Sequence, residues 1–390
     1  MLEDNELLIF VSPHNWYNHI LKRKNNRPLK IVEHLKNSNC FKNVMVVNRI
    51  HPKKVIFLDE NEKREIIKKG KFYNLLYDTL QRIYYLEHCL PFGFLEKTFL
   101  PGIIEKCSNL IGASHKNLWI FDPKSVYLFS EKYKKNIFDA YDDWAISPLF
   151  ESKKRHLKYI NKGYKTAREN ADLIFVNTTY MQQKYFNSNK NVYLLPNSSS
   201  LNIHNIGKKS KSFGDKKTIG YVGHIHNRID LEILEKLLIE FPDYNVIFLG
   251  ENHLNSEEFN RYINKYSNLR LLGSVEYNEL VDFIYAFDVA IVPHLVNSYT
   301  LSQDSMKIYD FLSCGKAIVT TSIPPSNILP KEEDFIYIAY SSDEFIEKVK
   351  IAIKNNNEYL KRMRMDYMLN NTWESRTSYI CKIFKEVEHG

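Results

Sequence analysis

The chain has 390 residues and a net charge of +8, and its length predicts two domains rather than one hydrophobic core. No run of about 18 apolar residues occurs, so we expect no transmembrane helix, and the acidic start MLEDNELLIF does not resemble a signal peptide. The cysteines are scattered without a CxxC pair, which predicts reduced thiols in a cytosolic protein and no metal site. They are Cys40, Cys89, Cys107, Cys314 and Cys381.

The charge is divided unevenly along the chain. Residues 1–200 contain 32 Lys and Arg against 20 Asp and Glu, whereas residues 201–390 contain 22 against 26. A basic first half predicts contact with a negative partner, for which anionic lipid headgroups and nucleic acid both qualify. A general bias toward Lys and Asn explains the same numbers without any partner.

The first elements predict a parallel βαβ unit. Residues 7–12 read as a buried strand, an amphipathic helix opens at Arg27, and residues 44–48 read as the next strand. The connecting loop leaves the carboxyl end of the first strand, where ligands bind in such sheets. It contains no GxGxxG motif and carries His14, Asn15 and Trp16.

Residues 72–107 combine many aromatic side chains with Lys and Arg. Leu75, Leu76, Leu80 and Ile83 have helical spacing in this stretch. One interpretation is a surface that rests on a membrane through apolar residues and basic neighbours. The alternative is a helix packed on the sheet, followed by a long insertion.

The strand–helix–strand alternation continues through 118–121, 125–129 and 136–140. Asp142 and Asp143 follow the last of these strands, and two adjacent carboxylates there suit binding of a hydroxylated acceptor or service as a base. The alternative is one helix cap and one solvated Asp. A basic helix at 153–170 and strands at 172–177 and 191–195 complete the first half.

Residues 197–217 are polar and rich in Lys, Ser and Gly, which predicts a linker. A fresh alternation follows, and we therefore expect a second α/β domain. Its predicted strands are 218–222, 244–249, 269–272 and 289–292, and its predicted helices are 230–240 and 277–287.

Residues 301–321 predict a helix that stops at Gly315 and leads into a short buried strand. Ser302 or Asp304 is expected to cap the helix. Asp304, Lys307 and Asp310 are spaced three apart, which predicts that they share one helix face. That face offers a cation for phosphate and a carboxylate for hydroxyl groups, although a solvated face with a salt bridge fits the spacing equally well.

Gly223 to Arg228 predict a turn from a strand into a helix. A glycine turn with free helix N–H groups suits a phosphate, and Arg228 adds a bidentate donor, although a plain turn has the same sequence. The turn and the 301–321 helix both lie at strand carboxyl ends of one predicted sheet. Together they predict a nucleoside diphosphate site, with Lys307 and Arg228 on phosphates, Asp310 on ribose, and residues 273–277 along the base.

The second half resembles the nucleotide-binding domain of the GT-B glycosyltransferases, particularly the retaining, family-4-like group 1 and its teichuronic-acid-type branch. The matching motifs are G-x-I-x-x-R-I-D (223–230), L-G-S-V (272–275), F-D-V-A-I-V-P (287–293) and K-I-Y-D-F-L-S-C-G-K-A-I-V-T (307–320). This chain departs from that family at three positions. Asp310 stands where the family usually has Glu, Ala317 where it usually has Pro, and Ser302 where the broader family often has Glu. Looser similarity covers most of the first half, except 60–110.

The resemblance implies an α/β GT-B fold, in which two Rossmann-like parallel-sheet domains face each other across a cleft. Residues 1–200 would form the acceptor domain, together with a C-terminal helix at 371–390 that crosses back to it. Residues 215–370 would form the donor domain.

The implied activity is sugar transfer from a nucleotide sugar, expected to be UDP-linked, to a cell-surface glycan, glycolipid or other acceptor. The resemblance implies retention of configuration and no metal or other cofactor, with leaving-group charge stabilised by Arg228, Lys307 and helix N-termini. A lipid-linked acceptor implies work in the cytoplasm at the inner membrane face. Nucleic acid is not an expected partner, because no reading motif accompanies the basic residues.

The expected site residues fall into four groups. The donor nucleotide is assigned to Gly223, His226, Arg228, Gly273, Val275, Lys307 and Asp310. The donor sugar is assigned to Ser302, Gln303, Asp304 and Ser305. Catalysis is assigned to His14, Asp142 and Asp143, and acceptor binding to Asn15 and Trp16.

Three other functions are compatible with the sequence. They are a nucleotide-sugar epimerase or hydrolase on the same fold, a basic binding protein, and a non-catalytic GT-B subunit.

Overall fold

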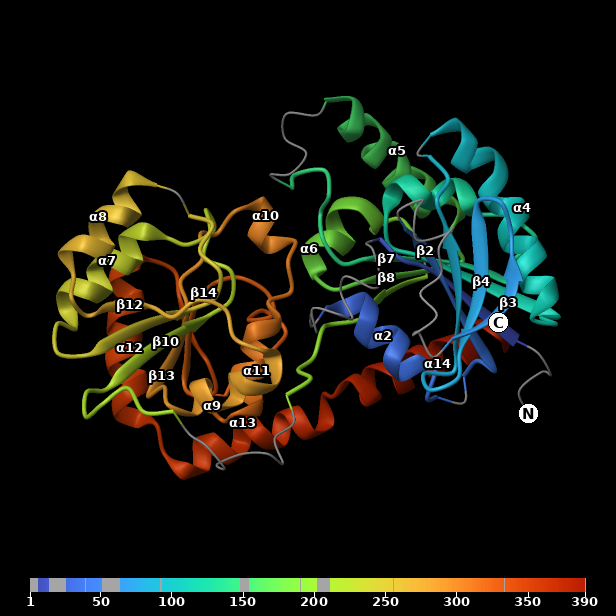
Figure 1. The fold of residues 1–390 in the computed structure, drawn as a ribbon. Helices are drawn as coiled ribbons and strands as arrows, with labels where there is room; N and C mark the ends of the chain where they lie inside the picture. Colours follow the sequence, from blue (N-terminus) through green and yellow to red (C-terminus); the bar gives the residue numbers. More distant parts are fainter. Residues whose placement is uncertain are drawn as a thin grey trace. The chain divides into compact units, whose positions relative to one another are not determined.

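The chain divides into two compact units in a computed structural model (Figure 1). The first unit comprises Met1–Leu195 with Thr377–Gly390, and the second comprises Pro196–Arg376. The structure describes residues 6–13, 26–38, 40–50, 64–91, 93–147, 154–189, 191–201, 211–254, 256–332 and 334–389. The described residues of the predicted linker, 197–201 and 211–217, thus belong to the second unit.

The first unit is built on one sheet with the order β3-β4-β5-β2-β1-β6-β7-β8-β9 among the described residues. Its strands are β1 (Glu6–Val11), β2 (Asn43–Arg49), β3 (Arg64–Lys69), β4 (Tyr73–Asp78), β5 (Ile83–His88), β6 (His115–Ile120), β7 (Lys135–Ala140), β8 (Leu173–Val176) and β9 (Val192–Leu194). Its helical segments are α2 (Arg27–Leu35), α4 (Phe94–Leu110), η1 (Pro123–Leu128), α5 (Lys154–Asn170), α6 (Thr179–Met181) and η2 (Gln182–Phe186).

The strands β1 and β2 pair in parallel, and α2 lies between them in the chain, which confirms the predicted βαβ unit. The helix α2 starts where expected because Asn26 caps it, accepting from the backbone N–H of Leu29, and Pro28 fits its first turn. The parallel sheet continues with β6, β7 and β8, in which β7 pairs with both β6 and β8.

The helical interpretation of residues 75–83 is wrong. These residues form β4 and β5, which pair antiparallel and extend the sheet, with β3 as its edge. The two strands meet at a turn in which Asp78 accepts from the backbone N–H groups of Leu80 and Gln81. Short, fully buried strands lack alternation, so their apolar spacing is hard to distinguish from that of a helix.

A buried ion pair joins the start of α2 to the middle of the sheet. Arg27 Nε lies 3.0 Å from Asp139 Oδ1, and Arg27 Nη1 donates to the carbonyl of Leu195 at 2.7 Å. Both side chains are almost completely buried. The pair therefore fixes α2 against β7 and against the chain that follows β9.

The second unit has a parallel sheet with the order β12-β11-β10-β13-β14-β15. Its strands are β10 (Thr218–Val222), β11 (Asn245–Leu249), β12 (Leu269–Leu271), β13 (Val289–Val292), β14 (Ile318–Thr321) and β15 (Tyr337–Ala339). Its helical segments are α7 (Leu231–Glu240), α8 (Glu257–Lys265), η4 (Tyr277–Glu279), α9 (Leu280–Tyr285), α10 (Ser298–Leu301), α11 (Met306–Ser313), α12 (Ser342–Asn355) and α13 (Glu358–Asn370).

Two apolar layers cover the faces of this sheet. One contains Leu234 of α7, Phe259 of α8 and Phe345 of α12, and the other contains Ile284 of α9 and Phe311 of α11. Burial of both faces is what forces the Val- and Ile-rich runs of β11 and β13. Because the strands are parallel, the loops that leave them lie at the carboxyl edge of the sheet, where the candidate site lies.

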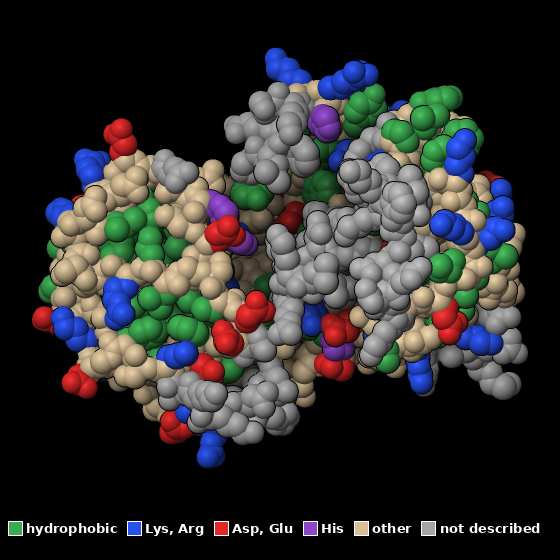
Figure 2. Space-filling view, in the orientation of Figure 1, with side chains coloured by type: hydrophobic (Ala, Val, Ile, Leu, Met, Phe, Trp, Pro, Cys, Tyr) green, Lys and Arg blue, Asp and Glu red, His purple; other side chains and the backbone are tan. Residues whose placement is uncertain are grey.

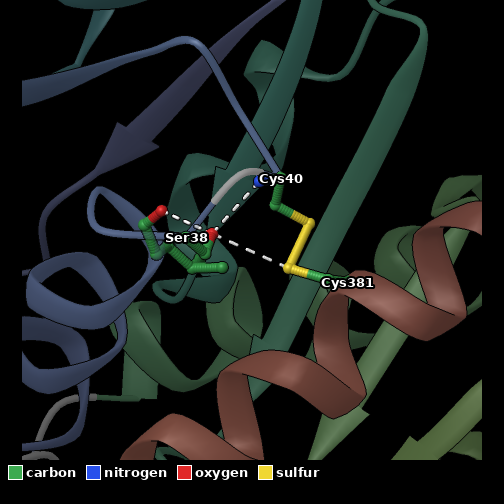
Figure 3. The surroundings of a disulfide bond; sticks show 4 residues. Ser38, Cys40 and Cys381 are labelled. Carbon is green, nitrogen blue, oxygen red and sulfur yellow. Dashed lines mark hydrogen bonds between the residues drawn. A yellow bond between two sulfur atoms is a disulfide. The ribbon is translucent and has the colours of Figure 1, made fainter. Parts of the chain in front are cut away.

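The helix α14 (Trp373–His389) leaves the second unit, and its residues from Thr377 onward belong to the first. Cys381 of α14 forms a disulfide with Cys40, with a Cα–Cα separation of 5.6 Å (Figure 3). The expectation of five reduced thiols is therefore wrong for this pair, because the fold brings together two cysteines 341 positions apart. Among the described residues, none of the helices combines the length and apolar character needed to cross a lipid bilayer.

Candidate functional site

The strand β10 ends in a glycine turn that packs closely against Lys307. Gly223 has φ of 119°, and a Cβ added to it would lie 2.9 Å from Lys307 Nζ. Gly250, which follows β11, would place a Cβ 2.2 Å from the carbonyl oxygen of Gly223. Glycine is therefore required at both strand ends, and no side chain separates the turn backbone from the Lys307 ammonium group.

The Lys307 ammonium group is held by neutral partners. Nζ donates to Tyr221 Oη at 2.8 Å, lies 4.2 Å from the centre of that ring, and is 3.4 Å from His294 Nε2. Burial lowers the pKa of Lys307 well below its ordinary value, and Arg228 lowers it further. A bound anion would reverse that penalty, so this position is suited to phosphate oxygens.

Arg228 supplies a second cation beside Lys307. Its Nη1 donates to Gln303 Oε1 at 3.3 Å, and its buried Nε has no hydrogen-bond partner within the described ranges. No carboxylate of those ranges lies within ion-pair distance of Arg228 or Lys307. Two cations that share a site without a counterion favour an anionic ligand.

Two histidines beside these cations are kept neutral. Burial, followed by Arg228, lowers the pKa of His226 to about 4. Burial, followed by Lys307 and Arg228, lowers the pKa of His294 well below its ordinary value. Burial is the larger cause for both histidines, and the nearby cations act in the same direction, so the two imidazoles add no positive charge to the site.

The helix α11 points its start toward the same edge of the sheet. Ser305 is its N-cap residue but makes no side-chain hydrogen bond to the first turn. The positive end of the helix dipole is therefore not neutralised by a side chain. The predicted caps, Ser302 and Asp304, both precede the position where the structure starts the helix.

Asp310 lies one turn further along α11 and is buried among hydroxyl groups. Its Oδ1 accepts from Ser199 Oγ at 2.6 Å and from Tyr277 Oη at 2.8 Å. Burial raises its pKa to about 6, although both hydrogen bonds and Lys307 oppose the shift. This is a carboxylate placed to accept hydrogen bonds rather than to neutralise a cation.

Asp304 does not share a helix face with Lys307 and Asp310, because it lies before α11. Its Oδ2 accepts from the backbone N–H of Asn197 at 2.5 Å, and its Oδ1 accepts from Tyr309 Oη at 3.0 Å. Ser302 is fully buried and donates to the carbonyl of Tyr299. The predicted solvated face is also wrong, since Asp304 and Asp310 are both buried.

The segment after β12, residues 273–277, contacts Asp310 through the side chain of Tyr277. Tyr277 contacts Asp310, whereas Gly273 is exposed with φ of 70° and Val275 packs against the apolar layer of α9 and α11. The segment thus has one side chain in the carboxylate cluster and an accessible backbone at its start.

In the first unit, the two adjacent carboxylates have different surroundings. Asp143 is fully buried and its oxygens contact Lys184 Nζ at 2.6 Å and Tyr185 Oη at 2.9 Å. Asp142 is partly exposed, and its backbone carbonyl accepts from Tyr164 Oη. His14, Asn15 and Trp16 lie outside the described residues.

Sequence reasoning missed Tyr221, His294 and Ser199, and it placed Tyr277 along the base without its contact to Asp310. Pro293-His294 directly follows β13, so the rule that ligands gather at strand carboxyl ends pointed to His294. Tyr221 lies inside a strand and Ser199 inside a polar run taken as a linker. Neither position carried a signal in the sequence, because their contacts join residues 86 and 111 positions apart.

Part of the second unit matches a known family of proteins. Residues 216–355 match the family model described as glycosyl transferases group 1. The chain is 20% identical over 263 residues to a Bacillus subtilis (strain 168) protein named as a teichuronic acid biosynthesis glycosyltransferase, TuaH. That match covers 63% of this chain and 66% of TuaH, slightly less than two thirds of its length.

Two solved structures have the same fold as the chain. Anabaena HepE, solved with UDP, has a TM-score of 0.65 at 10% identity and covers 98% of this chain and 100% of its own. The catalytic domain of starch synthase IV from Arabidopsis thaliana, solved with ADP and acarbose, has a TM-score of 0.65 at 10% identity and covers 99% of both chains. Residues 216–355 thus match a group 1 glycosyltransferase domain, and the chain has the fold of the GT-B glycosyltransferases.

Proposed function

We propose that this protein transfers a glycosyl group from a nucleotide sugar, with the nucleotide bound in the second unit. The observation that carries the proposal is the pair of cations, Lys307 and Arg228, which have no carboxylate partner in the described part of the chain and lie beside the Gly223 turn. The diphosphate would bind there, where the start of α11 adds its dipole.

Asp310 would accept hydrogen bonds from the ribose hydroxyls through Oδ2, since both of its recorded bonds end on Oδ1. Gly273 and Val275 would line the base with backbone groups. The nucleotide would also contact His226. The donor sugar would contact Ser302, Gln303, Asp304 and Ser305, and Asp304 would in addition position Asn197, whose backbone N–H it accepts from.

UDP is the proposed nucleotide, and transfer would proceed without a metal and with retention of configuration. HepE was solved with UDP, which supports UDP, whereas starch synthase IV was solved with ADP. Developing charge on the leaving diphosphate would be stabilised by Lys307 and Arg228.

Calorimetric titration of UDP, ADP and GDP in EDTA tests the donor site. UDP should bind most tightly, and Arg228→Ala should weaken it about tenfold or more, because one charge-assisted hydrogen bond contributes about 1.5–3 kcal/mol. Arg261→Ala, which removes an exposed arginine of α8, is the matched control and should bind as the wild type does. Equal binding by both variants, or no binding of any nucleotide, would refute the proposed site.

The acceptor is proposed to be a lipid-linked or anionic glycan held by the first unit at the inner membrane face. His14, Asn15, Trp16 and Asp142 would contact it, and Asp143 would keep the 141–147 segment in place through Lys184 and Tyr185. Exposed apolar side chains between β3 and α4 support membrane contact. They are Ile66, Ile67, Phe72, Leu80, Phe94, Leu95, Phe99 and Leu110.

Basic side chains accompany this apolar surface, and Figure 2 shows apolar groups beside Lys and Arg on the first unit. Lys68 and Lys69 lie on β3 with Ile66 and Ile67. Lys97 lies on α4 near Phe94, which is 80% exposed. Apolar side chains with basic neighbours suit the surface of an anionic bilayer.

Flotation with phosphatidylglycerol vesicles tests this contact. The wild type should float with these vesicles and not with phosphatidylcholine alone, and Phe94→Ser with Leu95→Ser should abolish flotation. Ile239→Ser removes an apolar residue of α7 that is 58% exposed, and it should have no effect. Absence of wild-type flotation would refute the membrane contact while leaving the donor site untouched.

A further inference from the structure

Three metal-ligating side chains meet at the carboxyl edge of the second sheet, outside the nucleotide site. His224 follows the Gly223 turn, while Glu251 and His253 follow β11 and Gly250. His253 Nε2 lies 3.3 Å from Glu251 Oε2, and His224 Nδ1 lies 3.9 Å from the same oxygen. One donor atom from each residue lies within 4.8 Å of the other two.

All three side chains are exposed, and Figure 2 shows histidine and acidic groups together on the surface of the second unit. An ordinary surface ion pair between Glu251 and one histidine contributes little to stability. Such a pair explains one imidazole near the carboxylate, whereas here two imidazoles from different loops approach the same oxygen.

The backbone fixes the two loops against each other. Ile225 N donates to the carbonyl of Glu251 at 2.9 Å, and His253 N donates to the carbonyl of Ile225 at 2.8 Å. Ile225 is fully buried next to the exposed His224, and Gly250 allows the backbone of Gly223 to approach. The three donors are therefore positioned by a short parallel bridge rather than by their own side-chain contacts.

We propose that His224, Glu251 and His253 bind one divalent transition-metal ion of the zinc type. Imidazole and carboxylate bonds to Zn²⁺ are about 2.0–2.2 Å long, so donors on a tetrahedral ion lie about 3.3 Å apart. The two separations from Glu251 Oε2, 3.3 Å to His253 and 3.9 Å to His224, are close to that value. Two imidazoles favour Zn²⁺ or Co²⁺ over Mg²⁺, which prefers oxygen ligands. The fourth position is left for water.

The ion would tie the loop after β10 to the loop after β11. The carbonyl of His224 accepts from Tyr221 Oη at 3.0 Å, and that hydroxyl in turn accepts from Lys307. A metal on His224 would therefore steady the phosphate-binding turn, and this consequence alone rests on the proposed function.

Titration of the untagged chain with Co²⁺ tests the site, because tetrahedral Co²⁺ has strong visible absorption. The wild type should saturate at one ion per chain. His253→Ala and Glu251→Gln should each weaken binding about 100-fold or more, since even outer partners of metal ligands contribute 10–100-fold. His115→Ala, which removes an exposed histidine of the first unit, should bind as the wild type does.

Absence of the absorption band, or equal affinity in all variants, would overturn the proposal. Unfolding midpoints in EDTA should match between wild type and Glu251→Gln, which separates loss of a ligand from loss of fold. UDP binding in EDTA should also survive in Glu251→Gln. A failed cobalt titration with intact UDP binding therefore rejects the metal site alone, and the reverse result rejects the nucleotide site alone.

Discussion

The two units bury charged side chains in opposite ways. In the first unit, Arg27 and Asp139 meet at 3.0 Å, and both are almost completely buried. In the second unit, Lys307 has neutral partners at Tyr221 and His294, while the buried Asp310 accepts from hydroxyl groups. A cation already paired with a carboxylate holds the fold together, whereas cations and carboxylates kept apart leave their charges for a ligand.

The largest expected effect comes from breaking the paired charges. Arg27→Met should destabilise the protein by about 3–5 kcal/mol, because it leaves Asp139 buried without its cation. Urea unfolding measures the loss. The double variant Arg27→Met with Asp139→Leu should recover most of it, and an equally unstable double variant would show that packing rather than charge explains the loss.

The second effect concerns Asp310, a buried carboxylate that forms no ion pair with the described residues. Because burial raises its folded pKa to about 6 from an ordinary 3.8, protonation favours the folded state. Relative to Asp310→Asn, the wild type should be most stable below about pH 4 and should lose about 3 kcal/mol as pH rises through about 6. Unfolding of both proteins from pH 4 to 8 measures the difference, and a constant difference would contradict the raised pKa.

A third substitution separates function from stability in the second unit. Lys307→Met should weaken UDP binding about 10–100-fold, because it removes a charge-assisted hydrogen bond. The free energy of unfolding should stay unchanged or rise slightly, since a desolvated cation without a carboxylate is removed. Calorimetry and urea unfolding give the two values. A loss of stability as large as that of Arg27→Met would mean that Lys307 stabilises the fold rather than serving nucleotide binding.

The smallest expected effect is on the residue that positions Arg228. Gln303→Ala removes the hydrogen bond to Arg228 Nη1 at 3.3 Å and should weaken UDP binding less than tenfold, since a typical hydrogen bond contributes about 0.5–1.5 kcal/mol. Titration of UDP measures it. A loss as large as that of Lys307→Met would mean that Gln303 contacts the nucleotide itself.

The predicted and observed folds differ where contacts between distant segments decide. The strands β10, β11 and β13 and the stop at Gly315 followed from local apolar runs and glycine chemistry. The antiparallel strands β4 and β5 were missed, because a buried strand and a helix share the same apolar composition. The Cys40–Cys381 disulfide was missed because sequence spacing says nothing about residues that a helix returns from the far end of the chain.

Local periodicity and backbone freedom were enough to predict the alternation of strands and helices, the glycine turn at Gly223 and the helix that carries Lys307 and Asp310. They could not predict that Lys307 lies against Tyr221 and His294, that Asp310 accepts from Ser199, or that Asp143 is buried against Lys184, because these contacts join distant segments. The charge state of a side chain and its availability to a ligand depend on which groups surround it in the fold. Local sequence patterns do not show which distant residues those are.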